Sequence, residues 1–543
     1  MTHRARRALF TVVVFFAVCA VVGSVLQRRV GAQSSADSSQ YRDNVRTFGD
    51  VYALVEQNYA EPISGEKADT VIFDGAIPGM LRVLDPHSNF YDPKAYAKMR
   101  EEQHGRYYGV GMTIQQQNGK VYVVFPAEGA PAFRAGIHPG DIIFSVDGKL
   151  VSIDGKDPNG LISSDLVAKA LKGPRGTHVQ ATMIREGQPK PLVFDLIRDE
   201  IPHPSVDLAY EIRPGVGYIH LTQFQETTAK EVIEAINNFG NIKGLIFDLR
   251  GNPGGLLSQA VEVSDHLLTK GQGIVSQRGR AFPDQEYKAT HGNGGKTFPI
   301  VVVVNRGTAS AAEIVSGALQ DHDRALIVGE TTFGKGLVQT VYNLNENTGL
   351  ALTTYHYFTP SGRLIQRNYS GVSLYDYYSH GGKPSIDTAN REVKLTDAGR
   401  TVYGGGGITP DEKIEGPKSN HFQDSLLIKD VFFHFAPVYL SYRSVDKNFQ
   451  VDDAVLAEFK KYLTAQSIPW TEADLSAVMD WLKIGIKDKI FTIQFGEQQG
   501  LRTRADWDPE IQKALGFLPE AQALEDHVHR VLTEKAEARS EGR

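Results

Sequence analysis

An uninterrupted apolar stretch over residues 300–304 constrains the fold of this chain more than any other feature. A strand with one exposed face alternates apolar and polar residues, so a strand that is apolar throughout must be buried on both faces. Residues 311–320, which follow it, are typical of a helix. Further strand-like and helix-like segments alternate between residues 201 and 329. This alternation predicts an α/β core with parallel strands.

Composition limits the classes of function. The chain has 543 residues, of which 41% are hydrophobic and 22% charged, as in an ordinary globular protein of several domains. The net charge of −6 gives no reason to expect a nucleic-acid partner. The only cysteine, Cys19, lies in the apolar N-terminal stretch, which excludes disulfides and cysteine metal sites from the folded part. We expect no metal and no cofactor.

The N-terminus has the pattern of an export signal or a membrane anchor. Residues 9–26 are uncharged and mostly apolar, and arginines precede and follow them. We predict that residues 1–32 are a signal peptide or an anchor, and the sequence leaves both open. In either case the body is exported to the cell envelope or periplasmic side, with the arginine-rich end in the cytoplasm. Uncleaved, residues 9–26 would hold the protein in the inner membrane.

Ser310 lies between the apolar strand and the helix that follows it. The first N–H groups of a helix are unpaired and carry the positive end of its dipole. The N–H of Ala311 can therefore stabilise an oxyanion formed at Ser310. Glu313, three residues after Ser310, also completes a capping box, which needs no catalysis. The serine is a candidate nucleophile or a helix cap.

Lys335 lies between two glycines and next to the strand-like residues 337–342. A lysine acts as a base near pH 7 only if burial lowers its pKa from about 10.4 by roughly three units. Its glycine neighbours and the adjacent apolar strand suit a close-packed site. Residues four apart on a strand share a face, so we expect Lys335 and Gln339 to point the same way.

Three segments together resemble the C-terminal processing peptidases, also called tail-specific proteases. These segments are residues 244–255, 307–313 and 334–339, and the resemblance extends over residues 40 to 415. It implies a core of the ClpP/crotonase type, a serine nucleophile, a lysine general base, a glutamine that orients the lysine, and an oxyanion hole of two backbone N–H groups. In that order, these residues are Ser310, Lys335, Gln339, and Gly255 with Ala311.

A second unit resembles a PDZ domain. Residues 107–114 form a glycine loop that leads into a strand, and residues 129–148 continue the pattern. In PDZ domains a peptide adds as a strand to a sheet edge, while N–H groups of the glycine loop bind its terminal carboxylate. The resemblance implies that residues 164–171 form the helix beside this groove. The implied carboxylate-binding residues are Gly109, Val110, Gly111 and Met112.

The rest of the chain is predicted from local patterns. Apolar residues at helical spacing, among them Phe48 and Val51, predict a helix with a packed face. Asp85, His87 and Ser88 are too close in sequence to form a catalytic triad, so we interpret them as a structural turn. Residues 369–400 have the composition of an exposed loop. The predicted order is an N-terminal helical region (41–104), a PDZ-like domain (105–200), a serine protease core (201–419) and a C-terminal helical extension (420–543).

Two functions follow from these predictions. The first is an exported serine endopeptidase that captures C-terminal tails of protein or peptide substrates with its PDZ-like domain and cleaves them with Ser310 and Lys335. The alternative is a catalytically inactive PDZ-bearing scaffold that binds peptides, in which Ser310 is a cap and Lys335 a surface charge. The C-terminal helices are predicted to pack within the chain or to form a homo-oligomer.

Overall fold

The structure, a computed structural model, describes residues 38–541 except 118, 152–159, 162, 380–390 and 442. The chain divides into two compact units, residues 1–80 and 81–543. The predicted signal or anchor, residues 1–32, lies outside the described residues. Among the residues that are described, no helix combines the length and the apolar character needed to cross a membrane.

The first unit is helical, as predicted. It contains α2 (Ser38–Asn58), α3 (Glu66–Thr70), the π-helical turn η1 (Val71–Ala76) and the start of α4 (Ile77–Arg82). The prediction of a packed face on α2 is wrong for this unit, because Phe48 is 54% and Val51 55% exposed. The described part of the unit holds no second apolar element of comparable length to cover that face.

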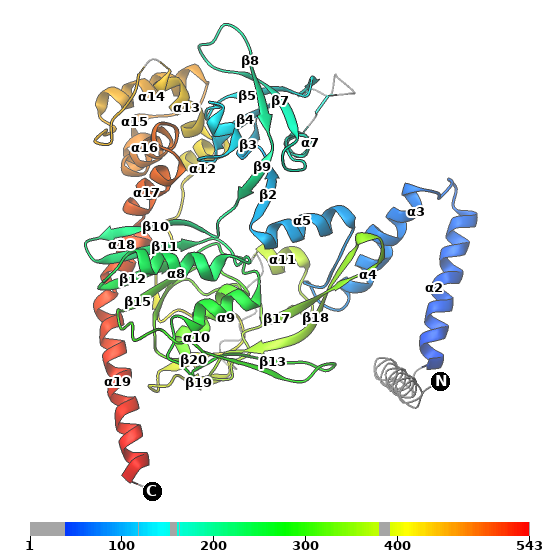
Figure 1. Ribbon diagram of the computed structural model, residues 1–543, viewed down its shortest axis with the longest axis vertical. Coiled ribbons are helices and arrows are strands. Elements are labelled where there is room, and N and C mark those ends of the chain that lie inside the picture. Colours follow the sequence, from blue (N-terminus) through cyan, green and yellow to red (C-terminus); the bar gives the residue numbers. More distant parts are fainter. Residues whose placement is uncertain are drawn as a thin grey trace, which may run out of the picture. The chain divides into compact units, whose positions relative to one another are not determined.

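A six-stranded sheet forms the centre of the second unit (Figure 1). Its order is β10 (Val206–Arg213), β11 (Val216–Leu221), β12 (Gly244–Asp248), β15 (Ile300–Val304), β16 (Leu326–Gly329) and β21 (Glu412–Lys413). All neighbours from β11 to β21 are parallel, and only β10 is antiparallel to its neighbour. Every residue of β15 is buried. The prediction of an α/β core with parallel strands is confirmed.

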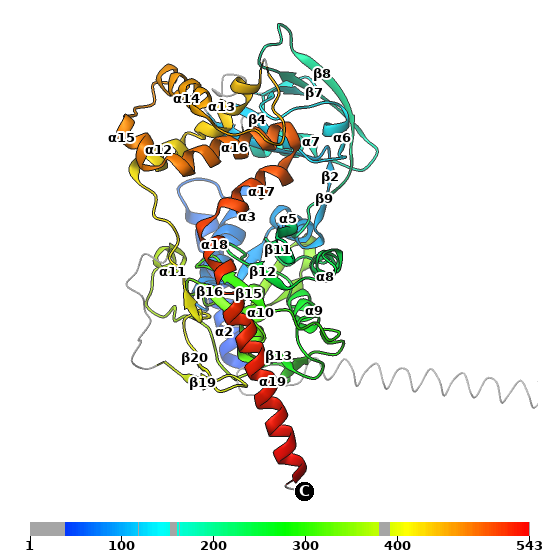
Figure 2. The same cartoon turned by 90° about the vertical axis from the view of Figure 1, so that its left-hand side faces the viewer.

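Helices cover both faces of this sheet, which explains the continuous apolar strand. One face packs on α8 (Thr228–Asn238), α9 (Leu257–Asp265) and α10 (Ala311–Asp321). The other face contacts α17 (Glu497–Trp507), α18 (Pro509–Gly516) and α19 (Leu518–Glu541), and Figure 2 shows α18 and α19 across β15 and β16. The last three helices, α17 to α19, therefore cover the face of the central sheet opposite to α8, α9 and α10.

A second sheet carries the strand that follows Lys335. It contains β1 (Asn89–Tyr91), β18 (Gly349–Phe358), β13 (Gly273–Arg278) and β14 (Gln285–Lys288), with β17 (Leu337–Asn343) paired to β18. A short helix, α11 (Leu374–Ser379), follows β18, and β19 (Val393–Leu395) pairs with β20 (Thr401–Tyr403). Tyr377 on α11 is only 2% exposed, so the prediction of an exposed loop over residues 369–400 is wrong at this helix.

The PDZ-like residues fold into a separate sheet. Its strands are β3 (Met112–Gln117), β4 (Lys120–Pro126), β5 (Ile142–Val146), β7 (His178–Ile184) and β8 (Leu192–Ile197), with β6 (Lys149–Leu150) paired to β5. The helices α6 (Pro131–Arg134) and α7 (Ser164–Leu171) belong to this unit. The antiparallel pair β2 (Arg106–Gly109) and β9 (Asp199–Pro202) connects this unit to the core. Strand β2 directly follows α5 (Pro93–His104) in the chain.

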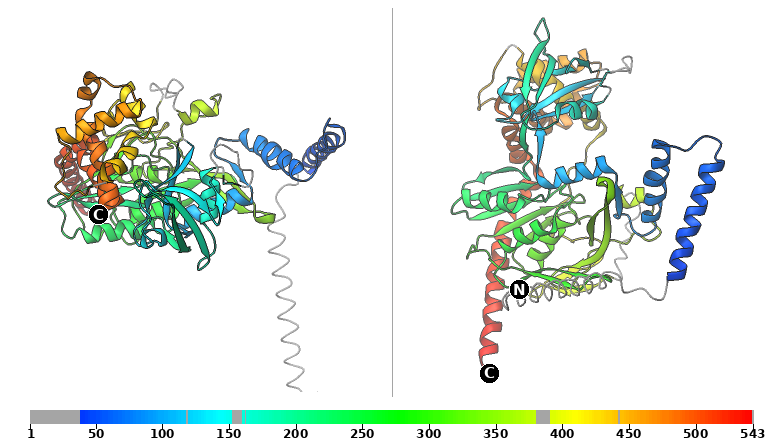
Figure 3. Two further views of the ribbon diagram at one scale, coloured as in Figure 1. Left: turned by 90° about the horizontal axis from the view of Figure 1, so that it is seen from above. Right: turned by 45° about the vertical axis from the view of Figure 1, so that its right-hand side comes forward.

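Five further helices lie beside the PDZ-like strands (Figure 3). They are α12 (His421–Ile428), α13 (Val431–Leu440), α14 (Asp453–Ala465), α15 (Glu472–Ala477) and α16 (Met479–Phe495), and they share a hydrophobic core. Helix α13 contacts the PDZ-like unit directly: the rings of His434 and Tyr122 have centroids 5.1 Å apart, and Gln115 donates a hydrogen bond to Asp430.

Candidate active site

Ser310 is the residue between the loop after β15 and the first turn of α10. Its backbone has φ 55° and ψ −115°, a conformation that a residue with a side chain rarely adopts. The Tyr357 hydroxyl donates a 3.1 Å hydrogen bond to the Ser310 carbonyl oxygen and supports this conformation. The predicted position of the serine between strand and helix is confirmed.

The loop after β12 packs directly on Ser310. Asn252 is fully buried, and its Oδ1 accepts a 2.8 Å hydrogen bond from Gly254 N–H, while its carbonyl accepts one of 2.8 Å from Ala309 N–H. Gly254 has φ +96°, and a Cβ atom there would lie only 2.7 Å from Ser310 Cβ and 2.8 Å from Ala311 N. Only glycine permits this close approach of the two loops.

Two backbone N–H groups near Ser310 are free to bind an anion. Gly255 has φ +142°, and a Cβ atom there would lie 2.0 Å from the carbonyl oxygen of Phe224. Ala311 is the first residue of α10. Neither N–H group donates a hydrogen bond to another residue in the described part of the chain. Unpaired donors at a helix start are suited to bind negative charge.

The buried carboxylate of Glu313 joins the serine segment to the lysine segment. Its Oε2 accepts hydrogen bonds from the N–H groups of Ser310 (2.8 Å) and Lys335 (2.9 Å). Its Oε1 accepts from Gly334 N–H (2.7 Å) and from the Thr332 hydroxyl. Burial raises the pKa of Glu313 to about 7, although these donors favour the charged form. The capping pattern indicated only the contact with Ser310, because the other partners lie far along the chain.

Lys335 lies in the loop before β17 and is partly buried. Burial lowers the pKa of its amine, and the charges of Glu313 and Asp85 oppose this shift. Within the described residues, Nζ makes no hydrogen bond or ion pair, and none joins it to Ser310 Oγ. The lysine is therefore desolvated as a base requires, but it is not hydrogen-bonded to the serine in this structure.

Lys335 and Gln339 do not lie on one strand, contrary to the prediction. Strand β17 begins at Leu337, after Lys335, and its pairing with β18 is irregular between Val338 and Gln339. Strand alternation therefore does not place Lys335 and Gln339 on one face. Gln339 Nε2 donates to Thr353 Oγ1 at 3.1 Å, and the described residues show no hydrogen bond from Gln339 to Lys335. A role in orienting the lysine stays a prediction.

The turn that begins at Asp85 lies beside the lysine. Asp85 Oδ1 accepts 2.8 Å hydrogen bonds from the N–H groups of His87 and Ser88, which confirms the predicted turn. Burial and the charge of Lys335 lower the pKa of His87 to about 4, so its imidazole is neutral. His87 Nε2 lies 2.9 Å from the hydroxyl of Tyr377. No local pattern predicts that this turn and α11 meet, because His87 and Tyr377 lie 290 positions apart.

A hydrogen-bonded chain connects these rings to the backbone next to the lysine. Gln366 Nε2 donates to the Tyr377 hydroxyl at 3.2 Å, and Gln366 Oε1 accepts from Gly336 N–H at 2.7 Å. The Phe333 ring stands edge-on to Tyr377, with ring centroids 5.4 Å apart. A cavity of about 340 Å³ opens at this cluster. Its lining includes Asp85, Pro86, Tyr369, Val372, Leu374 and Tyr377.

Comparison with known proteins identifies the family. The sequence model described as "Peptidase family S41" matches residues 215–373. The carboxy-terminal-processing protease of Bartonella bacilliformis is 38% identical over 362 residues, which cover 65% of this chain and 80% of that protein. The carboxy-terminal processing protease CtpA of Bacillus subtilis is 33% identical over 400 residues, 71% of this chain and 81% of that protein. The chain belongs to peptidase family S41.

Membership in this family decides between the two predicted functions. The relatives are named as carboxy-terminal processing proteases, and CtpB of Bacillus subtilis is a further one, 32% identical over 67% of this chain and 75% of its own length. The S41 chain described here is a serine endopeptidase, and the inactive scaffold is not favoured. The predicted fold, an S41 protease core with a PDZ domain and terminal helical segments, is also confirmed.

The model described as "PDZ domain" matches residues 109–195, which include the glycine loop. Gly111 has φ +71°, and a Cβ atom there would lie 2.3 Å from Ala130 Cβ. The N–H groups of Val110 and Gly111 donate to no other described residue. A small cavity of about 40 Å³ lies between this loop and α7. Its lining includes Val110, Gly111, Met112, Ile114, Ala168 and Leu171.

Proposed function

We propose that Ser310 and Lys335 are the catalytic dyad of this S41 endopeptidase. The neutral Lys335 amine takes the proton of Ser310 Oγ as Oγ bonds to the carbonyl carbon of the scissile peptide. The N–H groups of Gly255 and Ala311 bind the oxyanion. The lysine ammonium then protonates the leaving amine as the C–N bond breaks. Water gives a proton to Lys335 as its oxygen bonds to the ester carbonyl carbon. The Lys335 ammonium then returns this proton to Ser310 Oγ as the C–Oγ bond breaks, which releases the new C-terminus and restores both residues.

The contacts of Glu313 carry this proposal. One buried carboxylate accepts hydrogen bonds from the backbone of Ser310 and from that of Lys335, so the two segments meet at a fixed distance. The same serine lies against the loop of residues 250–255, which contains Gly255. The segments that carry the nucleophile, the desolvated amine and the two free N–H donors thus contact one another. In this proposal Gln339 orients the amine when substrate is bound.

Replacement of the nucleophile tests the dyad. We expect Ser310→Ala to abolish cleavage of a protein substrate that carries an apolar C-terminal tail. Ser316→Ala is the matched control, since Ser316 lies on the same helix, is buried, and donates to the Ala312 carbonyl at 2.8 Å. It should retain near wild-type cleavage. Cleavage that persists undiminished in Ser310→Ala contradicts the dyad.

We further propose that the PDZ domain binds the free C-terminus of a substrate. The residues that would hold the carboxylate are Gly109, Val110, Gly111 and Met112, and the peptide would lie between β3 and α7. In the Ser310→Ala chain, amidation of a test peptide should weaken binding by about 1.5–3 kcal/mol, the scale of hydrogen bonds to a charged group. Equal affinity for acid and amide excludes this role.

The location and assembly of the protein are proposed from the sequence pattern. Residues 9–26 would direct export and, if uncleaved, anchor the chain in the inner membrane. N-terminal sequencing of the envelope fraction distinguishes a chain that starts at Met1 from one that starts near residue 33.

Light scattering of the chain without residues 1–32 tests the predicted homo-oligomer through the C-terminal helices, and a monomeric mass excludes it.

A further inference from the structure

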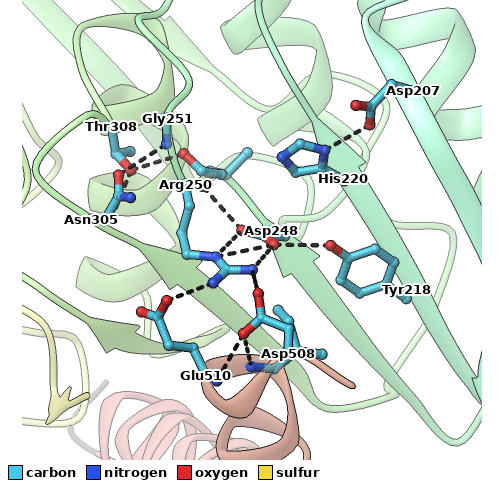
Figure 4. Close-up of polar contacts among 12 residues, drawn as sticks. Asp207, Tyr218, His220, Asp248, Arg250, Gly251, Asn305, Thr308, Asp508 and Glu510 are labelled. Atoms are coloured by element: carbon cyan, nitrogen blue, oxygen red, sulfur yellow. Dashed lines mark hydrogen bonds and ion pairs between the residues drawn. The ribbon is translucent and has the colours of Figure 1, made fainter. Parts of the chain in front are cut away.

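The Arg250 side chain is held by a group of carboxylates beside the loop of residues 250–255 (Figure 4). Arg250 follows β12 and begins the loop that carries Gly255. Its Nη2 lies 2.7 Å from Asp248 Oδ2 and 2.9 Å from Asp508 Oδ2. Its Nη1 lies 2.8 Å from Glu510 Oε2. The arginine side chain is only 15% exposed, so these ion pairs are largely shielded from solvent.

Two of the three carboxylates come from the C-terminal helices, outside the residues 215–373 that match the S41 family. Asp508 caps α18, because its Oδ1 accepts hydrogen bonds from the N–H groups of Glu510 (2.8 Å) and Ile511 (3.2 Å). Ile511 is fully buried and packs against the central sheet. Both acids are therefore fixed relative to the strands of the core.

The residues that follow Arg250 in the loop are also tied to the core. Gly251 N–H donates to Asn305 Oδ1 at 2.9 Å (Figure 4), and Gly254 packs on Ser310. Arg250 thus fixes the start of a short loop whose end bears one of the two oxyanion donors. Only five positions separate Arg250 from Gly255.

The energetics favour a geometric role for this cluster. A largely buried ion pair adds little net stability, because the desolvation of its charges offsets their attraction. Paired contacts of a guanidinium with carboxylates do fix direction, since its donors lie in one plane. Here Asp508 and Glu510 contact two different nitrogens of Arg250, so together they set both its position and its orientation.

We propose that Asp508 and Glu510 are positioning residues of the oxyanion hole. They do not touch substrate, and act through Arg250, which holds the loop of Gly255 at the correct distance from Ser310. The C-terminal helices would then be part of the catalytic apparatus as well as a layer of the core. This inference rests on the proposed function of Ser310 and Gly255.

The test is the double variant Asp508→Asn/Glu510→Gln in the chain without the predicted signal or anchor, residues 1–32. Both changes keep the shape of the side chains and remove their charges, and asparagine retains the oxygen that caps α18. We expect kcat to fall roughly 10- to 100-fold, less than or comparable to the loss of one oxyanion donor. KM should change by less than about twofold, because substrate binding itself is not altered.

Asp506→Asn is the matched control. Asp506 lies in the same segment and accepts a 2.8 Å hydrogen bond from the Tyr210 hydroxyl on β10, away from the glycine loop. It should keep wild-type kcat. The double variant leaves the largely buried Arg250 with only Asp248 of its three carboxylates, which lowers the melting temperature, so kcat is compared below the melting temperatures of both variants. The positioning role is overturned if the folded double variant has wild-type kcat. It is also overturned if the control loses kcat equally, or if only KM changes.

Reaction of Ser310 with a fluorophosphonate separates this inference from the dyad itself. The adduct is tetrahedral and places an oxygen in the oxyanion hole, so the double variant should react more slowly by a factor like that in kcat. If the wild type neither reacts nor cleaves, the proposed function fails. If wild type and double variant react equally fast, only the positioning role fails. Should the double variant not fold, each single variant must lower kcat, and wild-type values in both overturn the proposal.

Discussion

The serine side and the lysine side of this active site are built differently. Ser310 is held by short contacts between neighbouring loops: Gly254 packs on it, and the Asn252 carbonyl accepts a hydrogen bond from Ala309 N–H. Thr308 Oγ1 donates to the Leu249 carbonyl at 2.8 Å. Lys335 lies in a loop, and its amine has no hydrogen-bond partner among the described residues. Its surroundings include the Asp85 turn, whose His87 contacts Tyr377 of α11, and both segments lie far away in sequence.

This difference follows from what each group must do. A nucleophile and its oxyanion donors need fixed distances, which backbone hydrogen bonds and glycine contacts supply. A lysine base needs a lowered pKa, which depends on how well remote segments exclude water. Changes on the serine side should therefore reduce the rate at every pH. Changes around the lysine should move the pH at which the enzyme becomes active.

The largest expected effect is at the base. Lys335→Arg keeps a positive charge of similar length but cannot deprotonate in a protein. We expect kcat/KM to fall roughly 10³-fold at every pH, as for loss of a general base, and as far as in Lys335→Ala. Circular dichroism and steady-state kinetics check this. Substantial activity in folded Lys335→Arg would falsify the general-base role.

The link between the two sides gives the next largest effect. In Glu313→Gln, the new NH₂ group cannot accept the hydrogen bonds that one carboxylate oxygen now receives from two buried donors. We expect stability to fall by about 1–3 kcal/mol, the cost of unsatisfied buried groups, and kcat to fall roughly 10²-fold as the segments separate.

Thr332→Val is the control for this link, because it leaves the bonds from the Ser310 and Lys335 backbones to Glu313 in place. It removes a hydroxyl that donates to Glu313 and accepts a 2.7 Å hydrogen bond from Ile408 N–H, so its loss of stability comes from buried groups away from this link. It should lose far less activity. Denaturant unfolding and kcat for both variants decide the matter, and equal losses of activity in the two would show that the link has no special role.

A smaller, pH-dependent effect is expected at the aromatic cluster. Tyr377→Ala opens the cluster to water, which reduces the desolvation that lowers the pKa of Lys335. The pKa then rises, so less of the lysine is neutral at a given pH, and a shift of one unit lowers kcat/KM about tenfold on the ascending limb. At pH values above the new pKa the variant should approach wild type.

Tyr375→Ala is the matched control for the pH profile, because Tyr375 lies on the same helix and is 78% exposed. Its limb should coincide with that of the wild type. A uniform loss in Tyr377→Ala across the whole pH range, with no shift of the limb, would mean that the cluster positions the lysine without controlling its pKa.

Local sequence determined the elements of the serine side, although contacts such as that of Thr308 with Leu249 join them over 59 positions. The continuous apolar strand at 300–304, the helix after Ser310 and the glycines at 254 and 255 are near-neighbour patterns, and the structure places them as these patterns predict. Buried strands, helix starts and tight loops depend on residues within a few positions, so their chemistry is visible without a fold.

Only the tertiary structure decided which segments surround Lys335 and which residues support the loop of residues 250–255. Strand alternation does not relate Lys335 to Gln339, because β17 starts after Lys335 and its pairing is irregular between Val338 and Gln339. The contacts of Glu313 with Lys335, of His87 with Tyr377 and of Arg250 with Asp508 join segments 22, 290 and 258 positions apart. No local pattern contains such pairings, because they arise only when the chain is packed and each buried polar group must find a partner.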